Sequence, residues 1–314
     1  MVKLTSRVLV YTRVRPPTAK EAKEGLVVSV DSAEHAINLS DKNDREQHVF
    51  KCDGVFAPDA AQDAVFEEVG QPVLDATLEG YNGCVLAYGQ TGSGKTHTLL
   101  NPGESVSDSG LVPRIAAALF FRIGQDLAHV LTVRVSFLQI YNEQIDDLLK
   151  PAGASVNLRL RTAPSGAIDV EGATSVRVSS PAALMQLFNQ GRKNLVYAET
   201  RMNKSSSRSH AVFQLAIEKR ARVLGGGGTG GGGGGDGGAD GGVDTQLLSA
   251  KLTLVDLAGS ERVKRSGADA DLSGVRFREA VNINTSLLGC ARCPPLLTIT
   301  LTLTLTLTLT LTLT

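Results

Sequence analysis

The sequence predicts an α/β fold in which a central, mostly parallel mixed sheet has helices on both faces and a small antiparallel lobe beside it. Short apolar runs of strand type alternate with stretches whose apolar residues recur at helical spacing. A glycine-rich loop joins one such run to a following helix at residues 84–96. With 314 residues, the chain is long enough for one large core of this kind.

In the first half, residues 8–11 predict a strand that Pro16 and Pro17 bring to an end. Residues 26–56 alternate apolar and polar in short runs and predict the antiparallel lobe. The helical spacing of apolar side chains then predicts a helix over 61–78. A second helix over 111–127 and a long alternating strand over 131–141 follow.

In the second half, Ser180 followed by Pro181 predicts the start of another helix, with a cap and then a proline at the first helical position. Strands are predicted over 211–217 and 247–256. Between them, residues 225–242 are almost all glycine and predict a disordered loop at the tip of a hairpin. A linker between domains is the less favoured interpretation, because the two strands need each other as partners.

Composition restricts the classes of function. The 32 basic and 32 acidic residues balance, so no global charge points to nucleic acid or to a membrane. The four cysteines, at 52, 84, 290 and 293, and the lack of a secretory signal suit a reduced cytosolic protein. The CxxC pair at 290–293 has no second pair or histidine cluster near it, which disfavours a metal or redox role.

The chain ends in a Leu-Thr dipeptide repeat over 301–314, and residues 294–314 are predicted to form a low-complexity tail. The two-residue period is a strand pattern with a high aggregation risk. A transmembrane span is disfavoured, because every second residue carries a hydroxyl group. The favoured interpretation is a simple repeat without a selected function.

The eight residues that follow the run at 84–88 have the pattern of a phosphate-binding loop. Glycines let backbone N–H groups curl around a triphosphate. Lys95 would reach the β- and γ-phosphates, and the hydroxyl of Thr96 would lie on Mg²⁺. A plain glycine-rich turn would leave the Gly-Lys-Thr triplet unexplained. The loop is formed by Gly89, Gln90, Thr91, Gly92, Ser93, Gly94, Lys95 and Thr96.

Hydrolysis also needs a group that senses the γ-phosphate and one that positions water. Asp256 ends the apolar strand 252–255, where its carboxylate can hold Mg²⁺ through water, and Gly259 offers a mobile backbone N–H. In the segment 203–210, the hydroxyls of Ser206 and Ser207 can complete the metal shell. Taken singly, a charged strand end and a solvated serine-rich loop explain these segments equally well. The phosphate loop makes the catalytic interpretation the better one.

These motifs resemble those of the motor domain of the kinesin superfamily. The segment 203–210 fits the switch I pattern N-x-x-S-S-R-S-H, and 256–261 fits the switch II pattern D-L-A-G-S-E. The resemblance spans residues 8–289. Further matches are the R-x-R-P of 13–16, the phosphate-loop segment 80–98, the L-Q-I-Y-N-E of 138–143 with 147–149, and the I-N-x-S-L of 283–287.

The resemblance implies a P-loop NTPase that binds ATP with Mg²⁺, hydrolyses it and moves on microtubules in the cytoplasm. Ser206, with the switch backbone, would help order the attacking water. Arg208 and Glu261 would form the ion pair that closes the switches when Gly259 is drawn to the γ-phosphate, and a helix including 282–288 would transmit the change. By position, the adenine would be framed by Arg13, Pro16 and His97, and Mg²⁺ would be held by Thr96, Ser207 and Asp256.

Microtubules are acidic, so the resemblance also implies a basic surface facing the track. A solvated charged face is the alternative, and Asp269 and Asp271 add negative charge where the track expects positive charge. Exposed contacts of this kind are individually weak and depend on salt. The candidate residues are Arg159, Arg161, Arg262, Lys264, Arg265, Arg276 and Arg278.

The resemblance stops near Gly289, where family motors continue with a central strand beside the phosphate-loop strand. We therefore expect residues 1–293 to form a motor domain that is incomplete at its C-terminal end, with 225–242 as a loop insertion. Docking of the Leu-Thr repeat into the gap as a surrogate strand is an alternative that we do not favour. The alternative function is a non-motile remnant that binds nucleotide or tubulin without coupled ATPase. A GTPase is disfavoured, because no Asn-Lys-x-Asp segment follows 256–261.

Overall fold

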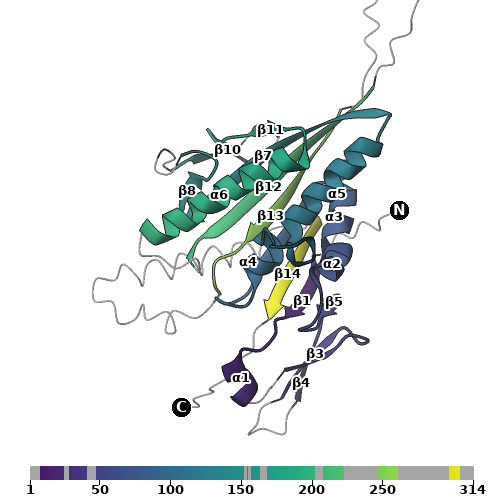
Figure 1. The fold of residues 1–314 in the computed structure, drawn as a ribbon, viewed down its shortest axis with the longest axis vertical. Coiled ribbons are helices and arrows are strands. Elements are labelled where there is room, and N and C mark those ends of the chain that lie inside the picture. The colour runs from purple at the N-terminus through teal and green to yellow at the C-terminus, as the bar shows by residue number, and fades with distance from the viewer. Residues whose placement is uncertain are drawn as a thin grey trace, which may run out of the picture.

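A nine-stranded mixed sheet lies at the centre of the computed structural model, which describes residues 8–24, 28–40, 47–151, 154, 157–162, 168–201, 208–222, 247–260 and 297–304 (Figure 1). The strand order is β11-β7-β12-β13-β6-β14-β1-β5, with β8 paired to β7. Pairing is parallel from β13 to β5 and antiparallel from β11 to β13. The strands are β1 (Leu9–Val14), β5 (Gly54–Phe56), β6 (Gly83–Tyr88), β7 (His129–Tyr141), β8 (Gln144–Asp147), β11 (Val176–Val178), β12 (His210–Ala221), β13 (Leu248–Asp256) and β14 (Leu297–Thr304).

The predicted antiparallel lobe is a three-stranded sheet, but it ends earlier than the alternation of the sequence indicates. Its strands are β2 (Val28–Asp31), β3 (Ala36–Ser40) and β4 (Gln47–Lys51). Strand β5 leaves the lobe and pairs in parallel with β1. Asp53 makes this connection, because its backbone N–H donates to Val10 O (2.8 Å) and its carboxylate accepts from Val10 N (2.8 Å). A second, two-stranded sheet contains β9 (Arg159–Thr162) and β10 (Ile168–Glu171).

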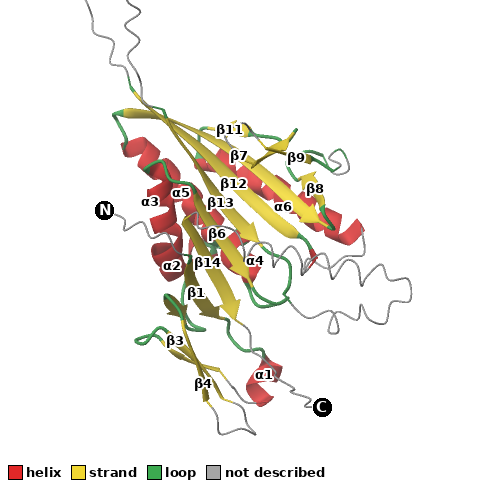
Figure 2. Ribbon diagram, turned by 180° about the vertical axis from the view of Figure 1, so that it is seen from behind, coloured by secondary structure: helices red, strands yellow, loops and turns green. Residues whose placement is uncertain are grey.

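Helices α2 to α6 lie on the same face of the central sheet, whereas the sequence predicts helices on both faces (Figures 1 and 2). The helix predicted over 61–78 is present but carries a π-helical segment at Phe66–Gly70 between α2 and α3. Residues 282–288, which are expected to be helical, lie outside the described residues. None of the described helices is both long and apolar enough to cross a bilayer. The helices are α1 (Ala19–Glu24), α2 (Gln62–Val65), α3 (Gln71–Leu78), α4 (Lys95–Leu100), α5 (Leu111–Gln125) and α6 (Pro181–Arg201).

Aromatic packing fixes α6 against the sheet. Phe188 of α6 stacks on Phe137 of β7 (6.0 Å between ring centroids) and meets Phe213 of β12 edge-on (5.5 Å). All three rings are fully buried. Gly191 lets the helix approach this closely, because a Cβ atom there would lie 2.3 Å from the Phe137 ring. The helix begins as predicted, with the Ser180 hydroxyl accepting from Ala183 N (3.1 Å).

The predicted hairpin partners pair over nine residues of each strand. Strands β12 and β13 are antiparallel from Ala211 opposite Asp256 to Lys219 opposite Leu248. The glycine-rich residues 225–242 lie outside the described residues. Strand β13 then pairs in parallel with β6, which places Asp256 opposite Ala87. The carboxyl ends of these two parallel strands therefore meet at one edge of the sheet.

Residues Leu297–Thr304 form the strand β14 between β1 and β6 (Figure 2). The strand is parallel to both neighbours, with Ile299 opposite Leu9 of β1 and Val85 of β6. The Leu-Thr segment thus occupies the position of the surrogate strand, which is the alternative that the sequence pattern alone did not favour. Its place in the sheet satisfies backbone groups of β1 and β6 that would otherwise face a gap.

Candidate nucleotide site

The loop between β6 and α4 has the conformation that its glycines permit. Gly92 and Gly94 have φ angles of 77° and 98°. These angles lie in the left-handed region, where an added side chain is strained even though it would meet no neighbouring atom within 4 Å. The loop therefore has open space beside its backbone at these two glycines.

Lys95 holds its ammonium group over this loop. Its side chain is buried, and Nζ donates to the carbonyl oxygens of Gly89 (2.8 Å) and Gln90 (2.9 Å). A buried cation is favoured by a nearby anion. The position of the lysine thus suits the phosphate contact that the sequence predicts for it.

Thr96 and Asp256 meet at the edge of the sheet where β6 and β13 end. The Thr96 hydroxyl donates to Asp256 Oδ2 (2.5 Å), while Oδ1 is buried without a hydrogen-bond partner among the described residues. Burial raises the pKa of Asp256 to about 6, against the opposing effects of the Thr96 hydrogen bond and the Lys95 charge. A hydroxyl and a carboxylate with an unsatisfied oxygen are ligands that Mg²⁺ prefers, so these residues fit that ion.

The segment after Asp256 folds back onto the phosphate loop. Leu257 N donates to Ala87 O (3.2 Å), and Ser260 N donates to Gly89 O (3.2 Å). Gly89 O therefore accepts from both Lys95 and Ser260, and Gly259 is buried between these contacts. The two segments that the sequence assigns to one ligand thus share a single carbonyl oxygen.

The segment 208–210 joins the same cluster through His210. Its Nδ1 accepts a hydrogen bond from Ala258 N (3.0 Å). Burial, helped by the Lys95 charge, lowers the pKa of His210 to about 4, so the ring is neutral at pH 7. Arg208 is half-buried just before it. Ser206, Ser207 and Glu261 lie outside the described residues, so their predicted roles in water positioning, metal binding and the ion pair with Arg208 stay predictions.

We expect His210→Leu to lower the free energy of unfolding at pH 7 by about 1–3 kcal/mol, because Ala258 N–H loses its buried acceptor. The unfolded chain binds a proton on His210 below about pH 6.5, whereas the folded chain resists until about pH 4. The wild type should therefore lose part of its stability advantage over His210→Leu as the pH falls from about 6.5 to about 4. The raised pKa of Asp256 instead increases the free energy of unfolding as the pH falls. This effect is the same in the wild type and in His210→Leu.

Urea denaturation at several pH values measures this difference. His48→Leu, at an exposed position in β4, is the matched control and should change stability little. An advantage of the wild type over His210→Leu that stays constant between pH 7 and pH 4 would contradict the assignment.

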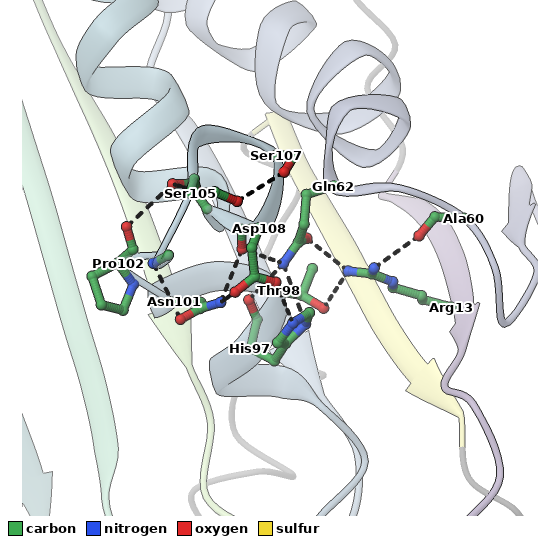
Figure 3. Close-up of polar contacts among 12 residues, drawn as sticks. Arg13, Ala60, Gln62, His97, Thr98, Asn101, Pro102, Ser105, Ser107 and Asp108 are labelled. Atoms are coloured by element: carbon green, nitrogen blue, oxygen red, sulfur yellow. Dashed lines mark hydrogen bonds and ion pairs between the residues drawn. The ribbon is translucent and has the colours of Figure 1, made fainter.

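Two of the residues predicted to frame the adenine, Arg13 and His97, are joined through a common partner, Gln62 (Figure 3). Arg13 turns inward, where its guanidinium donates to Gln62 Oε1 (2.8 Å), Thr98 Oγ1 (2.9 Å) and Ala60 O (3.0 Å). The side chain of His97 is half exposed. Pro16 is exposed and follows Arg15, which forms an ion pair with Glu21 (2.6 Å).

Sequence reasoning missed the contacts of Gln62 and Asp108 with His97, and it assigned no role to His210. Gln62 lies at the start of a helix that was recognised only by its apolar spacing, and Asp108 lies in a serine-rich stretch without a motif. His210 was visible as the last residue of the pattern at 203–210.

Of the predicted track residues, Arg159 and Arg161 are exposed on β9, and the five between 262 and 278 lie outside the described residues.

Comparison with known proteins gives a consistent result. The sequence profile of the kinesin motor domain matches residues 13–298. The kinesin-like protein KIN-4A of Oryza sativa subsp. japonica is 36% identical over 303 residues, covering 90% of this chain and 28% of that protein. The kinesin-like protein KIF15-A of Xenopus laevis is 37% identical over 292 residues, covering 88% of this chain and 19% of that protein.

A solved structure is also similar, described as "Structure of a fast kinesin: Implications for ATPase mechanism and interactions with microtubules". It superposes with a TM-score of 0.75 at 27% identity, covering 95% of this chain and 85% of that chain. The chain spans less than a third of the length of the two curated relatives named above. The similarity therefore concerns one domain of those proteins.

Proposed function

Because this chain belongs to the kinesin motor-domain family, we propose that it binds and hydrolyses ATP and couples the cycle to microtubule binding and movement. The observation that carries the proposal is the convergence on Gly89 O. That oxygen accepts from the phosphate-loop Lys95 and from Ser260 of the segment after Asp256. A ligand that displaced either contact would be sensed by both segments.

In this proposal, Lys95 binds the β- and γ-phosphates and the loop backbone holds the remaining oxygens. Thr96 and Asp256, joined by a hydrogen bond, hold Mg²⁺ together with Ser207. When bound, that ion would neutralise charge on the phosphates during transfer. Arg13, Pro16 and His97 form the adenine side, with Arg13 acting from inside the fold.

In the proposed cycle, two hydrogen bonds report the γ-phosphate. Movement of Gly259 towards a phosphate would pull on Ser260 N and on Ala258 N, which His210 holds. The segments at 203–210 and 256–261 would therefore move together. Ser206 would order the attacking water, and Arg208 with Glu261 would latch the closed state.

Microtubules, as acidic filaments, are the proposed partner, and the cytoplasmic microtubule cytoskeleton is the proposed location. Arg159 and Arg161 support this, because both are exposed on the β9–β10 hairpin, where they can contact acidic side chains. Such contacts weaken as salt concentration rises.

The test is ATP turnover by the purified chain with and without microtubules. We expect microtubules to raise the rate, and we expect ATP to be preferred over GTP. Nucleotide or tubulin binding without stimulated turnover would instead support the non-motile alternative. A preference for GTP would contradict both.

Asp256→Asn is expected to weaken binding of Mg²⁺–ATP and to change its dependence on pH. In the wild type, the metal competes with a proton once pH falls below about 6. Affinity should then drop by up to about tenfold per pH unit in addition to the titration of ATP itself. The asparagine variant should show only the titration of ATP.

Isothermal titration of both proteins from pH 7.5 to 5 measures this, with binding of ATP in excess chelator as the metal-free control. Equal pH slopes for the two proteins would contradict the role of Asp256.

A further inference from the structure

A chain of hydrogen bonds runs from β1 to the loop after α4 and passes through the predicted adenine side (Figure 3). Arg13 Nη1 donates to Gln62 Oε1 (2.8 Å). The other end of the Gln62 amide contacts His97, with Nε2 lying 2.9 Å from His97 O and 3.2 Å from His97 Nδ1. His97 Nε2 in turn lies 3.3 Å from Asp108 Oδ1. Gln62 itself is buried.

The orientation of the Gln62 amide is fixed at both ends. Arginine has only donors, so the group that faces Arg13 must be the amide oxygen. A backbone carbonyl has only acceptors, so the group that faces His97 O must be the NH₂ group. Both requirements give the same orientation, and a flipped amide would place like groups against each other at both ends.

This orientation decides which nitrogen of His97 carries the proton. The amide NH₂ group can only donate, and its two hydrogens are shared among His97 O, His97 Nδ1 and Asp108 O (3.4 Å), so Nδ1 faces a donor and carries no hydrogen. In the neutral ring the hydrogen is then on Nε2, where it points to the Asp108 carboxylate. Asn101 holds that carboxylate, because its Nδ2 donates to Asp108 Oδ2 (3.0 Å) and Asp108 O (2.9 Å). Each nitrogen of the His97 ring therefore faces a polar partner, Gln62 at Nδ1 and Asp108 at Nε2.

We propose that Gln62 is a positioning residue for the adenine base, because it sets the orientation and the tautomer of the His97 ring. The proposal rests on the proposed ATP site, in which His97 contacts the base. Arg13 then acts on the base indirectly, since its three hydrogen bonds to described residues go into the fold and one of them orients Gln62. Loss of Gln62 should loosen the base side of the site and leave the phosphate loop intact.

The tautomer is tested in the ligand-free chain by long-range ¹H–¹⁵N correlation of the histidine rings, with His97 assigned by its absence in His97→Gln. We expect a hydrogen on Nε2 only. Gln62→Glu keeps the acceptor for Arg13 but presents a second acceptor to Nδ1, so Nδ1 should gain a hydrogen. Gln62→Leu should leave a mixture of tautomers. Gln125→Glu, at the exposed end of α5, is the matched control and should change nothing.

The effect on the base is tested by comparing affinities for ATP and for inorganic tripolyphosphate, which lacks the base. Gln62→Glu and Gln62→Leu should bind ATP about two- to tenfold more weakly, as expected for one lost hydrogen bond, with tripolyphosphate unchanged. A wild-type His97 with its hydrogen on Nδ1, or an equal loss for both ligands, would overturn the proposal. Failure of the wild type to bind either ligand would overturn the proposed function and with it the role of Gln62 towards the base. Normal ATP binding by both variants would overturn only the role of Gln62.

Discussion

Replacing Lys95 by alanine is expected to abolish measurable ATP turnover, with a loss of at least about a hundredfold, as for removal of a preorganised group that stabilises developing charge. The ammonium group is already held over the loop by Gly89 O and Gln90 O. It therefore needs no reorganisation when phosphate charge develops. Alanine removes both the charge and this preorganisation, whereas Ser260 N remains bound to Gly89 O.

Steady-state turnover with saturating microtubules measures this effect, and thermal unfolding shows whether the variant is folded. Lys51→Ala is the matched control, because Lys51 lies on β4 in an exposed pair with Glu34 that contributes little. Turnover by Lys95→Ala equal to that of the wild type would remove the basis of the proposed function.

Truncation after residue 296 is expected to be the most destabilising change elsewhere in the chain, because it removes β14. Six residues of β1 and six of β6 pair with this strand. Without it, their N–H and C=O groups face a gap in the middle of the sheet. The cost should be comparable to the whole stability of a domain, about 5–15 kcal/mol. We expect the truncated chain to be unfolded or aggregated at 25 °C.

Circular dichroism and urea denaturation measure the loss. Truncation after Thr304 is the control, because it keeps β14 and removes only the residues that follow the strand. A chain that ends at 296 and unfolds at the same urea concentration as the control would show that the sheet does not depend on β14.

The fold class could be predicted from the sequence because its signals are local. The strand–loop–helix at 83–100 combines an apolar run, glycines and a Gly-Lys-Thr triplet, and the long strands β7, β12 and β13 alternate clearly. The family was predicted for the same reason and is confirmed by the comparisons. The catalytic roles of Ser206, Ser207 and Glu261 stay predictions.

The remaining features of the fold and of the site depend on contacts between residues that are far apart in the sequence. The alternation of 54–56 cannot show that β5 pairs with β1, since that choice is made by Asp53 and Val10 across 43 positions. Nothing around Gln62 shows that its amide meets both Arg13 and His97. The sequence placed Arg13 beside the base because it belongs to an R-x-R-P pattern. Only the three-dimensional structure shows its guanidinium turned into the fold.

The repetitive sequence of β14 has a consequence for how the middle of the sheet is specified. A one-residue shift of a strand exchanges its two faces, but a two-residue shift in a Leu-Thr repeat restores the same alternation. The repeat continues to Thr314, so several eight-residue windows have the same apolar and hydroxyl pattern as Leu297–Thr304. The alternation of the strand therefore does not by itself choose among these translationally equivalent windows.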